Sequence, residues 1–230
     1  SIAVQGKMTE EHSAAIDGAQ TRAALEDIYR PYKPKRRTRA TVAREKGLGP
    51  LAEEIFSQRA DLPVPEVLAA DYVDAEKGVE TVEDALAGAS DIIAEIISDD
   101  ADIRSALRRF IESNAFLVSK AATEEDSVYR LYYDFRQRVD KVQGHQVLAV
   151  NRGEKEGFLK AGIELDRELA LQRVRRAVIV PGSAVMAFVR AAADDAYDRL
   201  IWPSMEREER SALTDAACEG AIKMFALNLK

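Results

Sequence analysis

The residues with the clearest chemical potential form a run of cations early in the chain. Seven basic side chains and no acidic one occur within residues 30–44. They are Arg30, Lys33, Lys35, Arg36, Arg37, Arg39 and Arg44. The whole chain has 33 basic and 40 acidic side chains, a formal net charge of −7. A local excess of positive charge in an acidic protein indicates an anionic partner, and nucleic acid is the external candidate.

Two prolines and two tyrosines give this basic segment, residues 29–44, its expected shape. Pro31 and Pro34 fix their own φ and bias the preceding residues away from the helical region, which predicts an extended or turn-like chain over residues 30–37. Tyr29 and Tyr32 lie among the cations, where a ring can stack on a base while a cation contacts a phosphate. The predicted nucleic-acid-binding residues are Tyr32, Lys33, Lys35, Arg36, Arg37 and Arg39.

The same residues allow other interpretations. The arginines can pair with acidic helices of the same chain while a tyrosine anchors the segment to the core, or the segment can be a solvated loop. Residues 41–48 also carry the Ala-x-x-x-Gly spacing of a helix-turn-helix, through Ala43 and Gly47. That spacing predicts a helical hairpin with a glycine turn, which is common in proteins that do not touch DNA.

No other group of residues predicts catalysis or metal binding. The chain has two histidines, His12 and His145, and one cysteine, Cys218, with no zinc-ligand spacing. Acidic clusters occur near residues 99–102, 124–126 and 194–198, but charge runs at helix starts, loops and exposed helix faces are usually solvated. Neither a GxxxxGK loop nor a GxSxG motif occurs. We therefore expect a protein that is not an enzyme and that has no cofactor, metal or small-molecule substrate.

Composition favours a mainly α, multihelical fold. Of the 230 residues 47% are hydrophobic, enough for a proper core, and glycine and proline are few. Cys218 lies in a helical pattern, where we expect a small buried residue. The absence of a signal peptide and of a long apolar run predicts a soluble, cytoplasmic chain without a membrane partner.

Helix signals recur along the chain. Thr81 with Asp84 predicts a capping box at the start of the clearest amphipathic helix. We expect Pro203 to end one helix and Ser204 to cap the next, whose apolar stripe includes Ala217, Ala221 and Met224. The other helices are expected within residues 9–29, 40–46, 50–58, 82–97, 103–111, 145–157, 166–176 and 183–202. One or two short strands are expected around residues 115–118 and 158–165, whereas the aromatic residues of 129–135 fit either period.

The weakest seam lies near residues 136–145. We expect an N-terminal helical region over residues 1–140, which includes the basic segment, and a central helical region over residues 141–230. The chain starts at Ser1, and the last helical pattern continues to Lys230, so we expect a piece of a longer protein.

Several blocks of the sequence resemble a known family. Residues 25–38, LEDIYRPYKPKRRT, and residues 43–52, AREKGLGPLA, closely resemble the N-terminal signature of the Tex family of bacterial transcription accessory proteins. Residues 85–95, 145–157, 195–204 and 225–230 are similar to further family blocks. The resemblance runs essentially from end to end. It departs at residues 143–146, QGHQ, where the family usually has prolines and a His-Arg pair.

The resemblance implies the helical N-terminal and central region of a Tex-like protein. In the family this region precedes an RNase H-like domain, helix-hairpin-helix modules and an OB-fold RNA-binding domain, none of which is in this chain. It implies a non-catalytic scaffold that binds RNA or DNA in the context of the full-length protein, with the transcription machinery as a further candidate partner. The alternative is a protein–protein interaction scaffold in which the basic segment is an internal brace and the absent domains bind nucleic acid.

Overall fold

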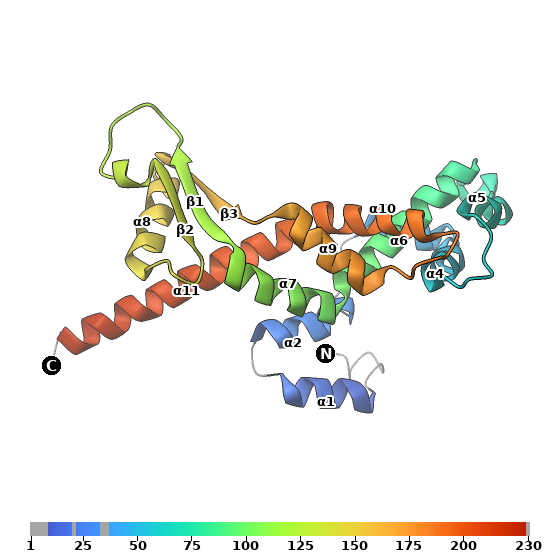
Figure 1. The fold of residues 1–230 in the computed structure, drawn as a ribbon, viewed down its shortest axis with the longest axis horizontal. Coiled ribbons are helices and arrows are strands. Elements are labelled where there is room, and N and C mark those ends of the chain that lie inside the picture. Colours follow the sequence, from blue (N-terminus) through green and yellow to red (C-terminus); the bar gives the residue numbers. More distant parts are fainter. Residues whose placement is uncertain (1–8, 20–21, 33–36, 229–230) are drawn as a thin grey trace. The chain divides into compact units, whose positions relative to one another are not determined.

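The computed structural model describes residues 9–19, 22–32 and 37–228, and this part of the chain is mainly helical with a small antiparallel sheet (Figure 1). The predicted fold class is therefore confirmed. The helices are α1 (Glu10–Gly18), α2 (Arg22–Tyr29), α3 (Arg39–Glu45), α4 (Gly49–Ser57), α5 (Pro65–Ala69), α6 (Val82–Asp99), α7 (Ala101–Asn114), α8 (Gly144–Lys155), α9 (Arg167–Val178), α10 (Met186–Asp195) and α11 (Trp202–Asn228). The strands are β1 (Phe116–Ala121), β2 (Asp134–Arg138) and β3 (Leu159–Glu164). Within the described ranges, no helix combines the length and apolar character needed to cross a membrane.

The chain forms two compact units, and neither is continuous in sequence. The first includes the chain up to Ala106 and again Leu171–Ile201, and the second includes Leu107–Ala170 and the chain from Trp202 onward. Residues 136–145, where the sequence has its weakest seam, lie within the second unit. The predicted division into residues 1–140 and 141–230 stays a prediction.

Helix α6 is the centre of the first unit. Its start is fixed by the predicted capping box, because the Thr81 hydroxyl accepts from Asp84 N–H at 3.1 Å and Asp84 accepts from Thr81 N–H at 3.1 Å. Apolar residues three and four apart then face the core; those buried are Ala85, Ala89, Ile92, Ile93, Ala94 and Ile97. Helices α3, α4, α5 and α10 all pack against α6.

Helices α3 and α4 form the hairpin that the Ala-x-x-x-Gly spacing predicts. Gly47 makes the turn with φ of +85°, a conformation that favours glycine, and Ala43 is buried at the contact with α6. Gly88 of α6 lies opposite, where an added Cβ would be 2.3 Å from Leu48 Cδ1. The small residues therefore allow α3 and α6 to approach closely.

The second unit is built on the three-stranded sheet, in the order β2-β1-β3, with both pairings antiparallel. Leu117 lies opposite Ile163 and both are buried, while α8 and α11 contact β3. Strands β1 and β3 confirm the expected strand positions. Strand β2 was not predicted, because its exposed positions are charged and only the intervening residues, Phe135 and Gln137, turn partly inward.

The helix boundary predicted at Pro203 is wrong. A π-helical segment, η5 (Ala196–Ile201), follows α10 directly, and Pro203 is the second residue of α11. The first turn of a helix tolerates proline, because a backbone N–H at that position has no acceptor within the helix. Just before Pro203, the π-helical turn replaces the regular α-helical hydrogen bonds. Ser204 consequently lies inside the helix and donates to Glu208 Oε1 at 2.9 Å instead of capping the helix.

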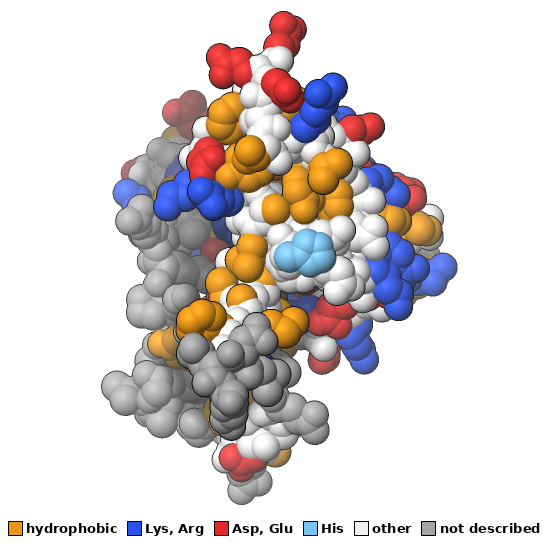
Figure 2. Space-filling view, turned by 90° about the vertical axis from the view of Figure 1, so that its left-hand side faces the viewer, with side chains coloured by type: hydrophobic (Ala, Val, Ile, Leu, Met, Phe, Trp, Pro, Cys, Tyr) orange, Lys and Arg blue, Asp and Glu red, His pale blue; other side chains and the backbone are white. Residues whose placement is uncertain are grey.

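Two predictions about α11 are also wrong. Cys218 is exposed, although we expected a buried residue. Along the predicted stripe Ala217 is buried, but Ala221 and Met224 are exposed, because the described part of the second unit does not cover the last turns of this helix. Figure 2 shows that hydrophobic side chains reach the surface on one face of the molecule.

Candidate nucleic-acid interface

The described part of the basic segment contains three of the six predicted contact residues. Tyr32 lies in a short 3₁₀ turn, Arg30–Tyr32, and is half-buried. This turn agrees with the turn-like chain that Pro31 predicts. Arg37 and Arg39 are exposed at the start of α3. Lys33, Lys35 and Arg36 lie outside the described residues.

Two other cations of the segment are ion-paired to α6. Arg30 Nε lies 3.4 Å from Asp99 Oδ1, and Arg44 Nη1 donates to Glu95 Oε2 at 2.5 Å. The Thr38 hydroxyl also donates to Glu95 Oε1 at 3.0 Å. These contacts hold the two ends of the segment against the same helix.

Glu95 and Asp99 are not among the residues predicted from the sequence. Glu95 is only 9% exposed, and it interrupts the run of apolar residues between Ile93 and Ile97. A carboxylate on the apolar face of a helix must find a hydrogen-bonded cationic partner, because burying it alone costs several kcal/mol. That isolated acid was the available signal for a partner among the cations of the basic segment.

Arg37 and Arg39 differ in their surroundings, although only one residue separates them. Arg37 Nη2 donates to Glu45 Oε2 at 2.7 Å, with side chains that are 70% and 52% exposed. Such an exposed pair contributes about 0–1 kcal/mol, so a phosphate can replace the carboxylate at little cost. Arg39, in contrast, has no ion-pair partner among the described residues, which leaves its guanidinium available to an anion.

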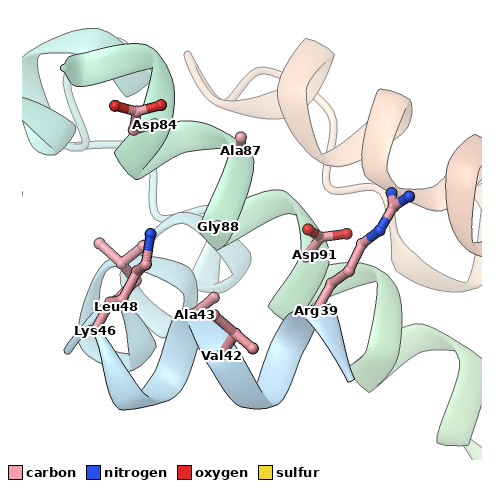
Figure 3. Close-up of a pocket in the computed structure, with 9 residues that line it drawn as sticks. All are labelled: Arg39, Val42, Ala43, Lys46, Leu48, Asp84, Ala87, Gly88 and Asp91. Carbon is pink, nitrogen blue, oxygen red and sulfur yellow. The ribbon is translucent and has the colours of Figure 1, made fainter. Parts of the chain in front are cut away.

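Arg39 lies at one end of a groove between α3 and α6 (Figure 3), which has a volume of about 300 Å³. Two cations line it, Arg39 from α3 and Lys46 from the residue that follows this helix, and two acids, Asp84 and Asp91, line it from α6. The other lining residues are small or apolar: Val42, Ala43, Leu48, Ala87 and Gly88. Lys46 donates to the Gly78 carbonyl at 2.7 Å, so Arg39 is the cation with the greater freedom to bind a ligand.

Two of the three acidic clusters, those near residues 99–102 and 194–198, make contacts within the fold. Asp100 Oδ1 accepts from Ile103 N–H at 2.8 Å at the start of α7, Asp194 pairs with Arg175 at 2.6 Å, and Asp195 pairs with Arg199 at 2.6 Å. No group of histidine, cysteine and acidic side chains among the described residues is arranged to hold a metal ion.

One hydrogen-bonded carboxylate in the second unit could suggest acid–base chemistry. Glu156 accepts from Arg152 Nε at 2.8 Å and from the Tyr129 hydroxyl at 2.8 Å. These two hydrogen bonds, that of Arg152 first, hold the pKa of Glu156 below its ordinary value. A general acid that acts at neutral pH needs a raised pKa, which is the opposite of the shift at Glu156. The cluster therefore has a structural role, and it fixes the end of α8.

Comparison with known proteins gives a consistent result. A family model described as Tex central region-like matches residues 61–225. The chain is 40% identical to the uncharacterized protein YdcI of Bacillus subtilis and 35% identical to protein tex of Bordetella pertussis, and all of the chain is covered in both alignments. It is 28% identical to the human S1 RNA-binding domain-containing protein 1, again over its full length. It spans 32%, 31% and 24% of these relatives, respectively.

Proposed function

Because this chain belongs to the Tex family, we propose that it is a non-catalytic helical scaffold of a transcription accessory protein and that its basic segment adds contacts to nucleic-acid phosphates. The chain covers about a third of the length of its bacterial relatives, so this role is that of one region within a longer protein. The partners are RNA or DNA and, through the longer protein, the transcription machinery, in the cytoplasm.

The observation that carries the proposal is the position of Arg39. Arg30 and Arg44 pair with Asp99 and Glu95, which fixes both ends of the segment on α6. Arg39 lies between them, exposed and without an ion-pair partner among the described residues. Because Arg44 holds α3 against α6, Arg39 on the same helix loses less conformational entropy on binding and is suited to a polyanion.

The expected contacts are to the phosphate backbone. Arg37 and Arg39, with Lys33, Lys35 and Arg36, would neutralise phosphates, and Tyr32 would stack on a base. Backbone contacts of this kind give affinity without sequence choice and make binding depend on salt. The relative named for an S1 RNA-binding domain is consistent with a nucleic-acid role for the longer protein.

A second candidate function is also favoured by a specific observation. The ion pairs of Arg30, Arg37 and Arg44 all lie within the chain. If all the cations of the segment serve the fold in this way, the chain is a protein-interaction scaffold and nucleic acid binds elsewhere in the longer protein.

Two variants separate these functions. The contact variant replaces Lys33, Lys35, Arg36 and Arg39 with Gln, and the brace variant replaces Arg44 with Gln. Binding of each to labelled single-stranded RNA and duplex DNA is measured across a salt series, and each is melted by circular dichroism. We expect the contact variant to melt normally and to reduce the salt slope by roughly 0.9 for each lost phosphate contact on duplex DNA.

The brace variant should behave in the opposite way. Removing the Arg44 cation leaves the carboxylate of Glu95 with fewer partners, which should destabilise the fold by about 1–3 kcal/mol and leave the salt slope nearly unchanged. If the contact variant binds as wild type does, or if wild type binds neither nucleic acid, the phosphate-contact role is wrong and the scaffold function stands.

A further inference from the structure

We infer that strand β2 is an interaction surface and that its partner is β2 of a second copy of this chain. The two strands would pair antiparallel and join two three-stranded sheets into one continuous sheet. The inference concerns the second unit alone, and it does not depend on the proposed contacts to nucleic acid.

The fold closes one edge of the sheet. Strand β1 lies between β2 and β3, so β2 and β3 are the two edge strands (Figure 1). On β3, Ala161 N–H donates to Glu154 Oε1 at 3.3 Å, and Ile163 N–H donates to Glu206 Oε1 at 3.1 Å. Two carboxylates therefore occupy the positions at which a further strand would form its hydrogen bonds.

The edge formed by β2 is open. Val139 N–H donates to the Ala115 carbonyl at 2.9 Å, which continues the register of β1 and β2 by one pair. Since hydrogen-bonded pairs alternate along antiparallel strands, the backbone groups of Asp134 and Arg136 point away from β1. Within the part of the chain that the structure describes, no other backbone segment hydrogen-bonds to these groups. They form a row of donors and acceptors that a further strand can pair with.

Apart from its charges, β2 lacks the features by which edge strands usually avoid association. It contains no proline and no bulge, and the side chains that turn toward the inner face are Phe135 and Gln137. Its charged side chains, Asp134, Arg136 and Arg138, are exposed. Pairing with a second β2 therefore depends on which of these charges lie opposite each other.

Charge selects one register for this pairing. In a two-fold arrangement centred on Phe135, Asp134 of each copy lies opposite Arg136 of the other, and each such pair exchanges both of its N–H···O bonds. A centre at Arg136 or at Asp134 would place like charges opposite each other, which is unfavourable. The register centred on Phe135 matches the charges, and it brings the two Phe135 side chains together at a closely spaced pair.

Arg136 is available for this contact. Its Nη2 donates to Glu164 Oε1 at 3.0 Å, in a pair whose side chains are 52% and 55% exposed. Its guanidinium carbon lies 3.4 Å from the centre of the Phe116 ring, which holds the side chain against the sheet. Because an exposed ion pair is weak and a guanidinium has several N–H donors, Arg136 can bind Asp134 of the second copy while it stays on Phe116.

Association of the 230-residue chain is measured by sedimentation velocity at up to about 500 μM, since a small interface is expected to be weak. The test variants, Asp134→Arg and Arg136→Asp, each place like charges opposite each other. We expect each variant alone to associate at least roughly tenfold more weakly than wild type. An equal mixture of the two should associate again, because the cations of one then face the acids of the other. The matched control, Lys160→Asp, makes the same charge change at an exposed residue of β3 and should associate as wild type does.

Amide hydrogen exchange in wild type gives a second measurement, which remains decisive if a variant fails to fold. We expect exchange at Asp134 and Arg136 to slow as the protein concentration rises, because their N–H groups become hydrogen-bonded across the interface. Association without this slowing would place the contact on another surface and overturn the inference.

Three other results would also overturn it. They are a wild-type chain that stays monomeric at every concentration, a test variant that associates as wild type does, and a mixture of folded variants that stays monomeric. None of these results bears on the proposed nucleic-acid contacts, which lie in the first unit.

Discussion

A buried ion pair connects α2 to α7, and removing one partner should sharply destabilise the first unit. Arg104 Nε donates to Asp27 Oδ1 at 2.9 Å; Arg104 is 0% exposed and Asp27 is 4% exposed. Asp27 lies just before the basic segment, so the pair also fixes where that segment begins. The perturbation is Asp27→Asn, which keeps the shape of the side chain and removes its charge.

The magnitude follows from the burial of both groups. Water cannot replace the lost carboxylate, so Asp27→Asn removes a charged partner from the buried Arg104 cation. Breaking a buried pair from one side costs about 3–5 kcal/mol. For a chain of this length each kcal/mol lowers Tm by roughly 2–4 °C, so the expected fall in Tm is roughly 6–20 °C.

A double-mutant cycle is the appropriate assay. Urea and thermal unfolding are followed by circular dichroism for wild type, Asp27→Leu, Arg104→Met and the double variant Asp27→Leu/Arg104→Met, with Asp27→Asn measured beside them. The double variant should be more stable than either single variant, because it removes both charges and restores apolar contacts. A loss below about 1 kcal/mol in Asp27→Asn, or additive losses in the double variant, would refute the reasoning.

Two further predictions concern a buried glutamine and a half-buried glutamate. Gln58 is buried in a left-handed conformation with φ of 50°, and its amide donates to the Val178 carbonyl at 2.7 Å and accepts from Val180 N–H at 3.0 Å. Gln58→Ala should therefore lower the free energy of unfolding by about 1–3 kcal/mol for each backbone group left unsatisfied, measured by urea unfolding, and an unchanged midpoint would contradict this. Burial first, and then the charge of Glu112, raises the pKa of Glu209, so the folded state binds this proton more tightly than the unfolded state. Stability is then lost as pH rises from the ordinary pKa through the raised one. Glu209→Gln should therefore increase Tm at pH 7, and the gain should disappear at about pH 3, where both states are protonated. An equal gain at both pH values would contradict the assigned cause.

The sequence predicted well those elements that depend on interactions between residues close together in the chain. The capping box of Thr81 and Asp84 and the apolar spacing after it gave the start and the buried face of α6, because a helix end needs side-chain acceptors and a helix packs along one face. The glycine turn at Gly47 was also predictable, since few other residues adopt its backbone conformation. The resemblance to Tex proteins, confirmed by the match over residues 61–225, likewise followed from residues adjacent in the sequence.

Elements whose neighbours come from distant parts of the chain were predicted less well. Strand β2 carries charges on alternate residues, and it exists because β1 supplies its hydrogen-bond partners. Pro203 fits within a long helix because the preceding turn is π-helical, a property that no single residue shows. Cys218 lies in a helical apolar pattern, but the part of the second unit that the structure describes does not cover it.

The candidate interface divides in the same way. A run of cations with proline-fixed turns at residues 29–44 is evident from the residues alone, because charge and proline geometry are properties of the residues themselves. Which of the described cations form ion pairs depends on the packing of distant helices. Folding brings Glu95 and Asp99 of α6, more than fifty residues away, against Arg44 and Arg30, and it leaves Arg39 beside a groove that two helices form together.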